Sequence, residues 1–299
     1  MTGRTLLVTG GSGRLAGEII RLLVERDEDR IITTTRTPER LQDLRALGVE
    51  VRRADFDEDV TATARALEGA DRMLLVSTHA VGRRPEQQGR VVDAAVLAGV
   101  GHLLYTSATS PAPTPVSTIV SEHFWTELAI QRSGLPWTML RHNMYAEHVF
   151  LFLPDAFRSG ELRTSLGGGA RAYVTRSDCA AADAAALAGE WRDERVYDIG
   201  GPDALTTDDI LALVEELTGR SIRHVRVDDA AALRAFADAD LPAGFPESAV
   251  GFDIWARRGY HAIVSPDMRE LTGREPEPLR SYLARHLDVV LAGRATVTL

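Results

Sequence analysis

A glycine-rich turn near the start of the chain has the residue types and spacing of a phosphate-binding loop. The turn, Thr9-Gly10-Gly11-Ser12-Gly13-Arg14-Leu15-Ala16, lies between a short apolar run that predicts a strand and a stretch with helical periodicity. This order directs free backbone N–H groups and the positive end of a helix dipole at one point. Gly10 permits a sharp turn, Gly13 permits close approach of a ligand, and Ala16 permits close packing of helix on strand. We therefore expect a pyrophosphate site that comprises Gly10, Gly11, Ser12, Gly13, Arg14 and Leu15. An ordinary strand-to-helix turn is the alternative, since the spacing is Gly-x-x-Gly-x-x-Ala.

The residues after the second predicted strand indicate which dinucleotide such a site would bind. An acidic side chain at this place binds the ribose 2′-hydroxyl of NAD, whereas arginine accommodates the 2′-phosphate of NADP. The chain has Arg36 here and Arg40 one helical turn later, with no carboxylate before Glu39. Guanidinium groups pair well with phosphate, so we predict NADPH as the cofactor, the alternative being two solvated arginines at a helix start. Asp55 and Phe56, after the third strand, are expected beside the adenine, although Asp55 could also serve a plain turn.

Length and composition predict a soluble globular protein. The 299 residues are 44% hydrophobic and 26% charged, enough for a substantial core. A net charge of −9 disfavours binding to nucleic acids or anionic membranes. The single cysteine, Cys179, excludes an intramolecular disulfide, and the histidine spacing indicates no metal site. With no signal peptide and no stretch of ~20 apolar residues, we expect a cytoplasmic protein, monomeric or homodimeric.

The elements that must position these residues alternate between strand and helix up to about residue 140. The expected strands are residues 5–9, 31–35, 49–54, 73–77, 103–106 and 137–140, each separated by a helical stretch. Such alternation predicts an α/β fold with a doubly wound parallel sheet, which binds ligands at the carboxyl ends of its strands.

Beyond Arg141 the alternation weakens. We predict that residues 1–145 form a Rossmann-type NAD(P)-binding domain and residues 146–299 a smaller α+β substrate lobe, with a segment near 190–205 rejoining the Rossmann sheet. The glycines at 167–169 indicate a hairpin or a flexible loop between two short strands.

Six segments follow one another as in a known enzyme family. They are Thr9–Ala16, Thr35–Pro38, Val51–Phe56, Tyr105–Ser107, Glu122–Glu127 and Ser133–Arg141. The chain resembles the NmrA-like atypical short-chain dehydrogenases, above all the branch typified by bacterial NADPH:quinone oxidoreductases of type two, and the likeness covers nearly the whole chain. The resemblance implies a Rossmann domain that binds NADPH and a small lobe that closes a cleft over the nicotinamide. It also implies cofactor contacts at Ser77, Thr78, His79 and Ser107.

The catalytic residues of ordinary short-chain dehydrogenases are only partly present. Ser107 lies at the place of their catalytic serine or threonine, but their tyrosine and lysine are missing, and His123 and Glu127 occupy roughly those places. Reduction of a simple carbonyl needs an acid that protonates the developing alkoxide. A quinone needs less help, because hydride addition gives a delocalised phenolate that water can protonate. The site therefore favours a quinone or another activated acceptor, with a helix-surface His123 that does no chemistry as the alternative.

The family pattern is broken after Leu140-Arg141, where the chain continues His142-Asn143-Met144-Tyr145. We expect these residues to form the floor of a substrate cleft beside Ser107 that residues 142–152 bound; the alternative is that His142 and Asn143 only satisfy the turn. The expected substrate contacts are His79, Ala108, His123, His142, Asn143, Met144 and Tyr145. The candidate catalytic residues are His123, Ser107 and Tyr145.

Three functions are compatible with these residues. The first is NADPH-dependent hydride transfer to a small-molecule acceptor, a quinone or a similar conjugated carbonyl. The second is reduction of a ketone, enone or imine of specialised metabolism, with His123 or Tyr145 as the proton donor. The third is a non-catalytic redox sensor that binds the dinucleotide and regulates a partner.

Overall fold

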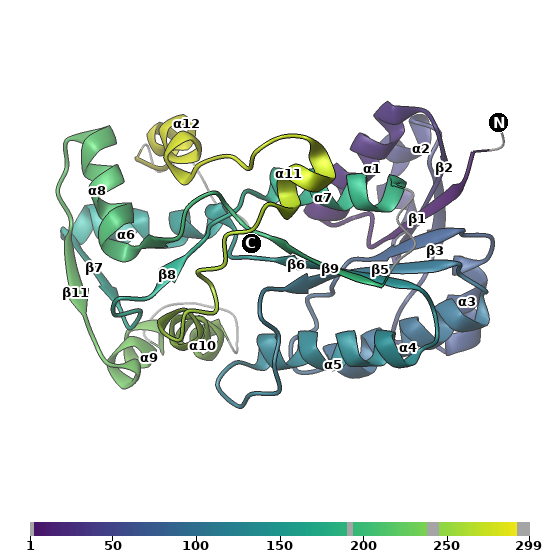
Figure 1. Cartoon of the computed structure of the whole chain (residues 1–299), viewed down its shortest axis with the longest axis horizontal. Coiled ribbons are helices and arrows are strands. Elements are labelled where there is room, and N and C mark those ends of the chain that lie inside the picture. The colour runs from purple at the N-terminus through teal and green to yellow at the C-terminus, as the bar shows by residue number, and fades with distance from the viewer. Residues whose placement is uncertain (1–2, 190–193, 238–244, 292–299) are drawn as a thin grey trace.

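A parallel sheet of seven strands forms the centre of the computed structural model, which describes residues 3–189, 194–237 and 245–291 (Figure 1). In spatial order the strands are β3 (Glu50–Arg53), β2 (Arg30–Thr35), β1 (Thr5–Thr9), β4 (Arg72–Leu75), β5 (His102–Ala108), β6 (Trp137–His142) and β9 (Arg195–Ile199). The central strands are apolar runs whose side chains are buried on both faces, as parallel sheets require. The predicted α/β fold with a doubly wound parallel sheet is confirmed.

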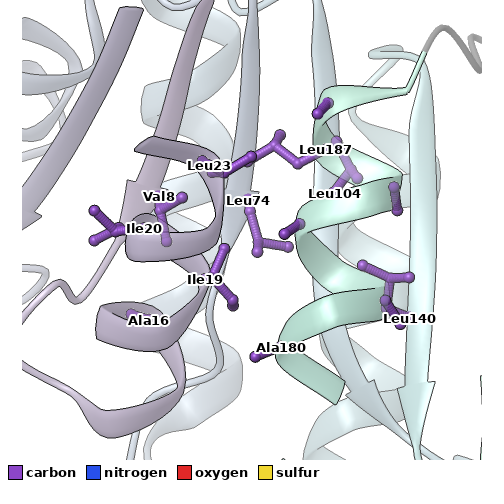
Figure 2. Close-up of a cluster of buried hydrophobic side chains, with 14 of the residues drawn as sticks. Val8, Ala16, Ile19, Ile20, Leu23, Leu74, Leu104, Leu140, Ala180 and Leu187 are labelled. Carbon is purple, nitrogen blue, oxygen red and sulfur yellow. The ribbon is translucent and has the colours of Figure 1, made fainter. Parts of the chain in front are cut away.

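Helices cover both faces of this sheet. Helices α1 (Arg14–Arg26), α2 (Gln42–Ala46) and α7 (Arg176–Ala188) lie on one face, and α3 (Val60–Leu67), α4 (Arg84–Leu97) and α5 (Thr118–Arg132) lie on the other (Figure 1). The alanines of α7 let it approach α1 closely, and Leu187 and Ala180 meet Ile19 and Leu23 above the strands (Figure 2). This packing fixes the start of α1 and the start of α7 side by side.

A second cluster of buried hydrophobic residues lies on the face of the sheet that α3, α4 and α5 cover. Helix α4 allows a matched test of its packing. Val92 is 2% exposed on α4, whereas Val96, one turn later, is 44% exposed. We expect Val92→Ala to lower the free energy of unfolding by about 2 kcal/mol, because two buried methyl groups are lost and a cavity remains. Val96→Ala changes helix propensity equally and should cost less than about 0.5 kcal/mol. Urea denaturation of both variants measures the difference, and equal losses would contradict this placement of the core.

The chain leaves the sheet twice to build a lobe beyond its carboxyl edge (Figure 1). The first excursion contains η2 (Ala146–Leu151), α6 (Leu153–Ser159), β7 (Glu161–Thr164) and β8 (Ala170–Arg171), before α7 and β9 return to the sheet. The second contains β10 (Leu205–Thr206), α8 (Thr207–Thr218), β11 (Arg223–Arg226), α9 (Asp229–Ala237) and α10 (Phe245–Arg257), followed by α11 (Asp267–Thr272) and α12 (Leu279–Leu291). Because β9 pairs with β6, the lobe is interrupted by sheet residues. Residues 190–193 of the segment expected to rejoin the sheet lie outside the described residues.

The glycines at 167–169 do not close a hairpin. Strand β7 pairs in parallel with β11, and β8 pairs antiparallel with β10, so the two strands expected to face each other have other partners. A Cβ on Gly169 would lie 2.8 Å from the backbone of Ala256 and Arg257, which shows that this loop passes directly against the end of α10. The alternative of a loop is therefore the one that the structure shows.

Candidate active site

The glycine turn has the geometry of an anion site. Gly10, after β1, has a φ of +70°, and Gly13 is the N-cap residue of α1. Within the described residues no side chain caps α1 and its first turn carries no acidic residue, so its backbone donors face outward uncompensated. A pyrophosphate fits this turn. The N–H of Gly13 is used within the turn, by the Gly10 carbonyl at 2.8 Å, so the donors left for a ligand lie further into the first turn of α1.

Gly11 has a role that the spacing did not reveal. A Cβ at this position would lie 2.3 Å from Oγ1 of Thr33, and the Gly11 N–H donates to the carbonyl of Thr34 at 3.0 Å. Gly11 therefore fastens the turn to β2. The Oγ1 of Thr35 continues this connection, since it donates to Oγ of Ser12 at 3.3 Å. The turn and the residues that follow β2 are thus held as one surface.

Arg36 and Arg40 lie on that surface. Both side chains are exposed, and within residues 3–189, 194–237 and 245–291 neither has an ion-pair partner. Arg36 follows the last residue of β2, and Arg40 lies in the short helix η1 (Pro38–Arg40). Two uncommitted guanidinium groups beside a pyrophosphate turn are suited to the 2′-phosphate of NADPH.

Asp55 and Phe56 follow β3 at the same edge. Oδ1 of Asp55 accepts from the N–H of Asp57 at 3.1 Å, which is the turn-forming role that the sequence left open. Phe56 is half-buried and packs against the cluster beneath the sheet. A contact of either residue with an adenine remains a prediction.

Side-chain hydroxyls end β4 earlier than the apolar run predicts. The N–H of Val76 donates to Oγ1 of Thr9 at 2.9 Å, and the N–H of Ser77 donates to Oγ1 of Thr106 at 2.8 Å. These two bonds replace the strand ladder after Leu75, so the chain opens at the carboxyl edge of the sheet. Thr78 follows, with its N–H on Oε1 of Gln88 at 3.1 Å.

Residues from three loops meet at this edge. Partial desolvation of the His79 ring, and then the charges of Arg84 and of Arg176 at the start of α7, lower the pKa of His79. Ser107 and Ala108 end β5 beside Arg141 and His142 of β6. The structure therefore brings the loops after β4, β5 and β6 together as predicted for a doubly wound sheet.

Ser107 carries a hydroxyl that the fold leaves unused. The side chain is 4% exposed, and in the described part of the chain its Oγ has no hydrogen-bond partner. Buried hydroxyls are nearly always bonded, so an unused one at the carboxyl edge of the sheet points to a ligand. This supports the prediction that Ser107 contacts cofactor or acceptor.

His123 belongs to a buried network on the face of the sheet that α4 and α5 cover, where the side chain of Tyr105 also lies. It is 5% exposed on α5, and its Nδ1 accepts from Oη of Tyr105 at 2.7 Å, since Tyr105 itself accepts from Nε2 of Gln88 at 3.2 Å. Burial lowers the pKa of His123 well below its usual value, and nearby Arg84 and His142 lower it further. His123 is therefore neutral near pH 7, which makes it a weak proton donor.

Glu127, the other residue at the place of the missing pair, is committed to structure. Its two carboxylate oxygens accept from Nε and Nη2 of Arg141 at 2.9 and 2.7 Å, and this bidentate pair joins α5 to β6. One turn earlier, Glu122 lies buried beside Arg84, and desolvation raises the pKa of Glu122.

The residues after β6 divide into two groups. The side chain of Asn143 is occupied: its Nδ2 donates to the carbonyl of His261 at 3.0 Å, and its Oδ1 accepts from the N–H of Met144 at 2.8 Å. Asn143 therefore satisfies the turn, the alternative that the sequence left open. The sulfur of Met144 contacts Nδ1 of His148 at 2.9 Å.

His142 and Tyr145 form the second group, together with an aspartate that the sequence analysis missed. Nε2 of His142 lies 2.8 Å from Oδ1 of Asp183, and Nδ1 of His142 lies 3.2 Å from Oη of Tyr145. Tyr145 is half-buried. The only signal for Asp183 in the sequence is a carboxylate in the middle of an alanine-rich helix.

Two aromatic residues of the stretch expected to bound the cleft pack into the hydrophobic core of the lobe. Phe150 is 4% exposed and packs against Tyr282 of α12, with ring centroids 5.7 Å apart, inside the lobe. Phe152 is partly buried against the same cluster. A cleft bounded by residues 142–152 remains a prediction.

A hollow of about 770 Å³ lies elsewhere, at the amino-terminal ends of the strands. It is lined by Gly3, Arg4, Ala70, Asp71, Arg72, Gly99, Gly101, His102, Pro136 and Gly189. Parallel sheets bind ligands at the carboxyl ends, so we assign this hollow no part in the chemistry. No helix among the described residues is long and apolar enough to cross a membrane. Nor do those residues hold a cluster of three or more potential metal ligands.

Buried neutral histidines make the folded state sensitive to acid. Burial lowers the pKa of His148 to about 4 and that of His261 to about 3, and that of His123 also lies well below its usual value. In the unfolded chain these groups titrate near 6.5. As the pH falls from about 6.5 toward these values, the unfolded state binds more protons, so the free energy of unfolding must fall. Urea titrations at several pH values measure the slope; His261→Phe should make it shallower by one proton, and a flat profile would contradict the assignment.

Known proteins similar to this chain agree with the geometry. A sequence model of the NAD(P)H-binding family matches residues 10–189. Quinone oxidoreductase 2 of Escherichia coli K12 is 30% identical over 285 residues, which cover 95% of this chain and 99% of that protein. Its crystal structure with NADPH superposes with a TM-score of 0.89 at 30% identity, again over 95% and 99% of the two chains.

A second relative comes from Streptomyces griseus. The (4-alkanoyl-5-oxo-2,5-dihydrofuran-3-yl)methyl phosphate reductase is 32% identical over 284 residues, which cover 95% of this chain and 98% of the relative. The family model matches more than half of the chain, and both relatives are similar over nearly its full length. Both findings agree with the observed fold and with the uncapped glycine turn. The chain therefore belongs to the NAD(P)H-binding, NmrA-like family.

Proposed function

We propose that this NAD(P)H-dependent oxidoreductase transfers hydride from NADPH to a quinone or a similar conjugated carbonyl acceptor. The observation that carries the proposal is the state of the two residues at the place of the usual tyrosine and lysine. His123 is buried and neutral, and Glu127 is paired with Arg141. Neither reproduces the tyrosine–lysine pair with which ordinary short-chain dehydrogenases reduce a simple ketone, whereas a conjugated acceptor spreads the charge that hydride transfer creates and needs only a weak proton donor.

The names of the two relatives agree with this acceptor class. One relative is named a quinone oxidoreductase, and the other a reductase of an oxo- and alkanoyl-substituted dihydrofuran. Both names describe rings that carry carbonyl groups. We propose the same class of acceptor, a ring that carries carbonyl groups, for this chain, and neither relative's own substrate.

The residues present fit the cofactor. The first turn of α1 would bind the pyrophosphate, and Arg36 and Arg40 would bind the 2′-phosphate. When bound, NADPH supplies the hydride. The loops after β4 and β5, with His79 and Ser107, would then lie near the nicotinamide, and the unused hydroxyl of Ser107 would donate to the carbonyl of the acceptor or of the nicotinamide amide.

We assign the proton donor to Tyr145. Of the two candidates, His123 is neutral and its Nδ1 is already occupied by Tyr105. Tyr145 is half-buried at the carboxyl edge of β6, and burial raises the pKa of its hydroxyl well above the usual value, so it carries its proton at pH 7. A neutral phenol can donate that proton to an enolate or phenolate oxygen as charge develops there.

A screen of acceptors tests the proposal. NADPH oxidation is followed with one- and two-ring quinones, enones, ketones and imines at matched concentrations. We expect kcat/KM to be highest for quinones or enones and lowest for simple ketones. Turnover of imines or ketones alone would instead indicate a reductase of specialised metabolites. NADPH binding without turnover of any acceptor would indicate a redox sensor.

A further inference from the structure

A buried chain of three polar groups joins the centre of α7 to the carboxyl edge of the sheet. Asp183 is 0% exposed on α7, and its Oδ1 lies 2.8 Å from Nε2 of His142, which is 7% exposed at the end of β6. The other ring nitrogen of His142 lies 3.2 Å from Oη of Tyr145. Of the three side chains only Tyr145 is appreciably exposed, so this series of hydrogen-bonded groups leads from the interior outward to the predicted cleft.

The position of Asp183 is costly and has no structural reason in its helix. Its neighbours on α7 are Cys179, Ala180, Ala182, Ala184 and Ala186, all buried. Burial of a carboxylate costs free energy unless it is paired, a cost that an apolar residue at this position would not carry. Burial raises the pKa of Asp183, while His142 lowers it, and its Oδ2 has no hydrogen-bond partner in the described chain. The contact with His142 is thus what this carboxylate serves.

We propose that Asp183 and His142 are positioning residues that hold the hydroxyl of Tyr145 toward the acceptor and return a proton to it after each turnover. The inference deepens the proposed function and rests on it. In the proposed arrangement Nε2 of His142 donates to Asp183, and when the ring takes up a second proton Nδ1 donates to Oη of Tyr145, which leaves the proton of Tyr145 directed at the acceptor.

The proton balance of the step is simple. Hydride addition leaves a negative oxygen on the acceptor, and the O–H bond of Tyr145 breaks as that oxygen takes the proton. The Nδ1 proton of His142 moves to Oη, so the phenol is restored and the ring becomes neutral while it still donates from Nε2 to Asp183. Water then returns one proton to the ring. The hydrogen bond between Nε2 of His142 and Oδ1 of Asp183 is kept throughout, and the carboxylate favours the protonated ring.

Other charged and titratable groups surround the hydrogen-bonded series Asp183–His142–Tyr145 and influence how its protonation depends on pH. Arg176 of α7 lies with its guanidinium 5.4 Å from the centre of the Tyr145 ring. Glu147 of η2 accepts from the N–H of Arg176, and the buried thiol of Cys179 is near enough to Tyr145 and Asp183 to interact electrostatically with both. The rings of His148 and His123 face the same region from η2 and α5. None of these groups bonds to the Tyr145 hydroxyl in the described structure.

Asp183→Asn tests the proposal, because asparagine keeps the shape and removes the charge. The matched control is Asp178→Asn on the same helix: Asp178 is 2% exposed but pairs with Arg274 and the N–H of Glu277, away from the sheet edge. With an enone acceptor, we expect Asp183→Asn to lower kcat about tenfold, leave KM for NADPH unchanged and enlarge the solvent isotope effect. The pH above which kcat falls should move to lower values. Asp178→Asn should change none of these quantities.

A second measurement needs no turnover. In the ¹⁵N spectrum of the wild-type histidines, Nε2 of His142 should carry a proton that exchanges slowly. Loss of that signal in Asp183→Asn supports the pair, and an unprotonated Nε2 in the wild type overturns it. Equal pH profiles and isotope effects in the two variants would also overturn it while the oxidoreductase activity stands. A wild type that oxidises no NADPH with any acceptor overturns the proposed function and the proton return together.

Discussion

Replacement of both Arg36 and Arg40 with aspartate is expected to reverse the cofactor preference, with the ratio of NADPH to NADH affinity falling by at least about a hundredfold. The wild type should bind NADPH at least about tenfold more tightly, roughly 1.4 kcal/mol. Each guanidinium is exposed and has no ion-pair partner among the described residues, so both can bind the 2′-phosphate. A charged hydrogen bond of this kind contributes about 1.5–3 kcal/mol, and a carboxylate in its place repels the phosphate.

Calorimetric titration with each dinucleotide measures the ratio. Arg65→Asp is the control, because Arg65 is an exposed arginine of α3 away from the turn and carries the same charge change. It should leave the ratio unchanged. Equal affinities of the wild type for NADPH and NADH would refute the role of the two arginines.

Tyr145→Phe is expected to lower reduction of enones or ketones by about 10²–10⁴, the usual contribution of a positioned general acid. The loss should be much smaller with quinones, since water can protonate the delocalised phenolate. The variant keeps the ring, and therefore keeps its contacts with His148 and with the guanidinium of Arg176. Values of kcat/KM for matched quinone and enone acceptors give the comparison.

His123→Phe serves as the comparison variant at the position where ordinary members of the enzyme class carry their acid. Because His123 is neutral and bonded to Tyr105, we expect its loss to affect quinones and enones alike, through packing, and by less than Tyr145→Phe. If instead the enone activity fell only in His123→Phe, Tyr145 would not be the donor.

The sheet and the turn could be predicted because local rules decide them. Apolar runs separated by helical stretches give parallel strands, and Gly10 has the positive φ that its place in the turn suggested. The Thr-x-x-Asp spacing at residues 206–209 is likewise the local signal of the capping box of α8, where Thr206 and Asp209 bond each other's backbone N–H groups.

The errors arise where distant segments decide the outcome. Asp178 lies in the first turn of α7, where an acidic residue commonly serves the helix start, but Thr175 caps the helix by accepting from the Asp178 N–H, and Asp178 pairs with Arg274, 96 residues away. Of the hairpin and the loop that the glycines at 167–169 left open, the structure has the loop, because β7 pairs with β11. The candidate site depends on similar distant contacts, since His142 pairs with Asp183, which lies 41 residues later in the chain. Neither hydrophobic periodicity nor residue spacing along the chain predicts that contact.

The central claim, hydride transfer from NADPH to a conjugated acceptor, is tested most directly by a single turnover. The NADPH-loaded protein is mixed without oxygen with one equivalent of a one- or two-ring quinone, and the reduced nicotinamide is followed by its absorbance. The account predicts oxidation of one NADPH per quinone reduced, slowed when deuterium occupies the transferred position at C4. Tight NADPH binding with no oxidation by any quinone, enone, ketone or imine would contradict it.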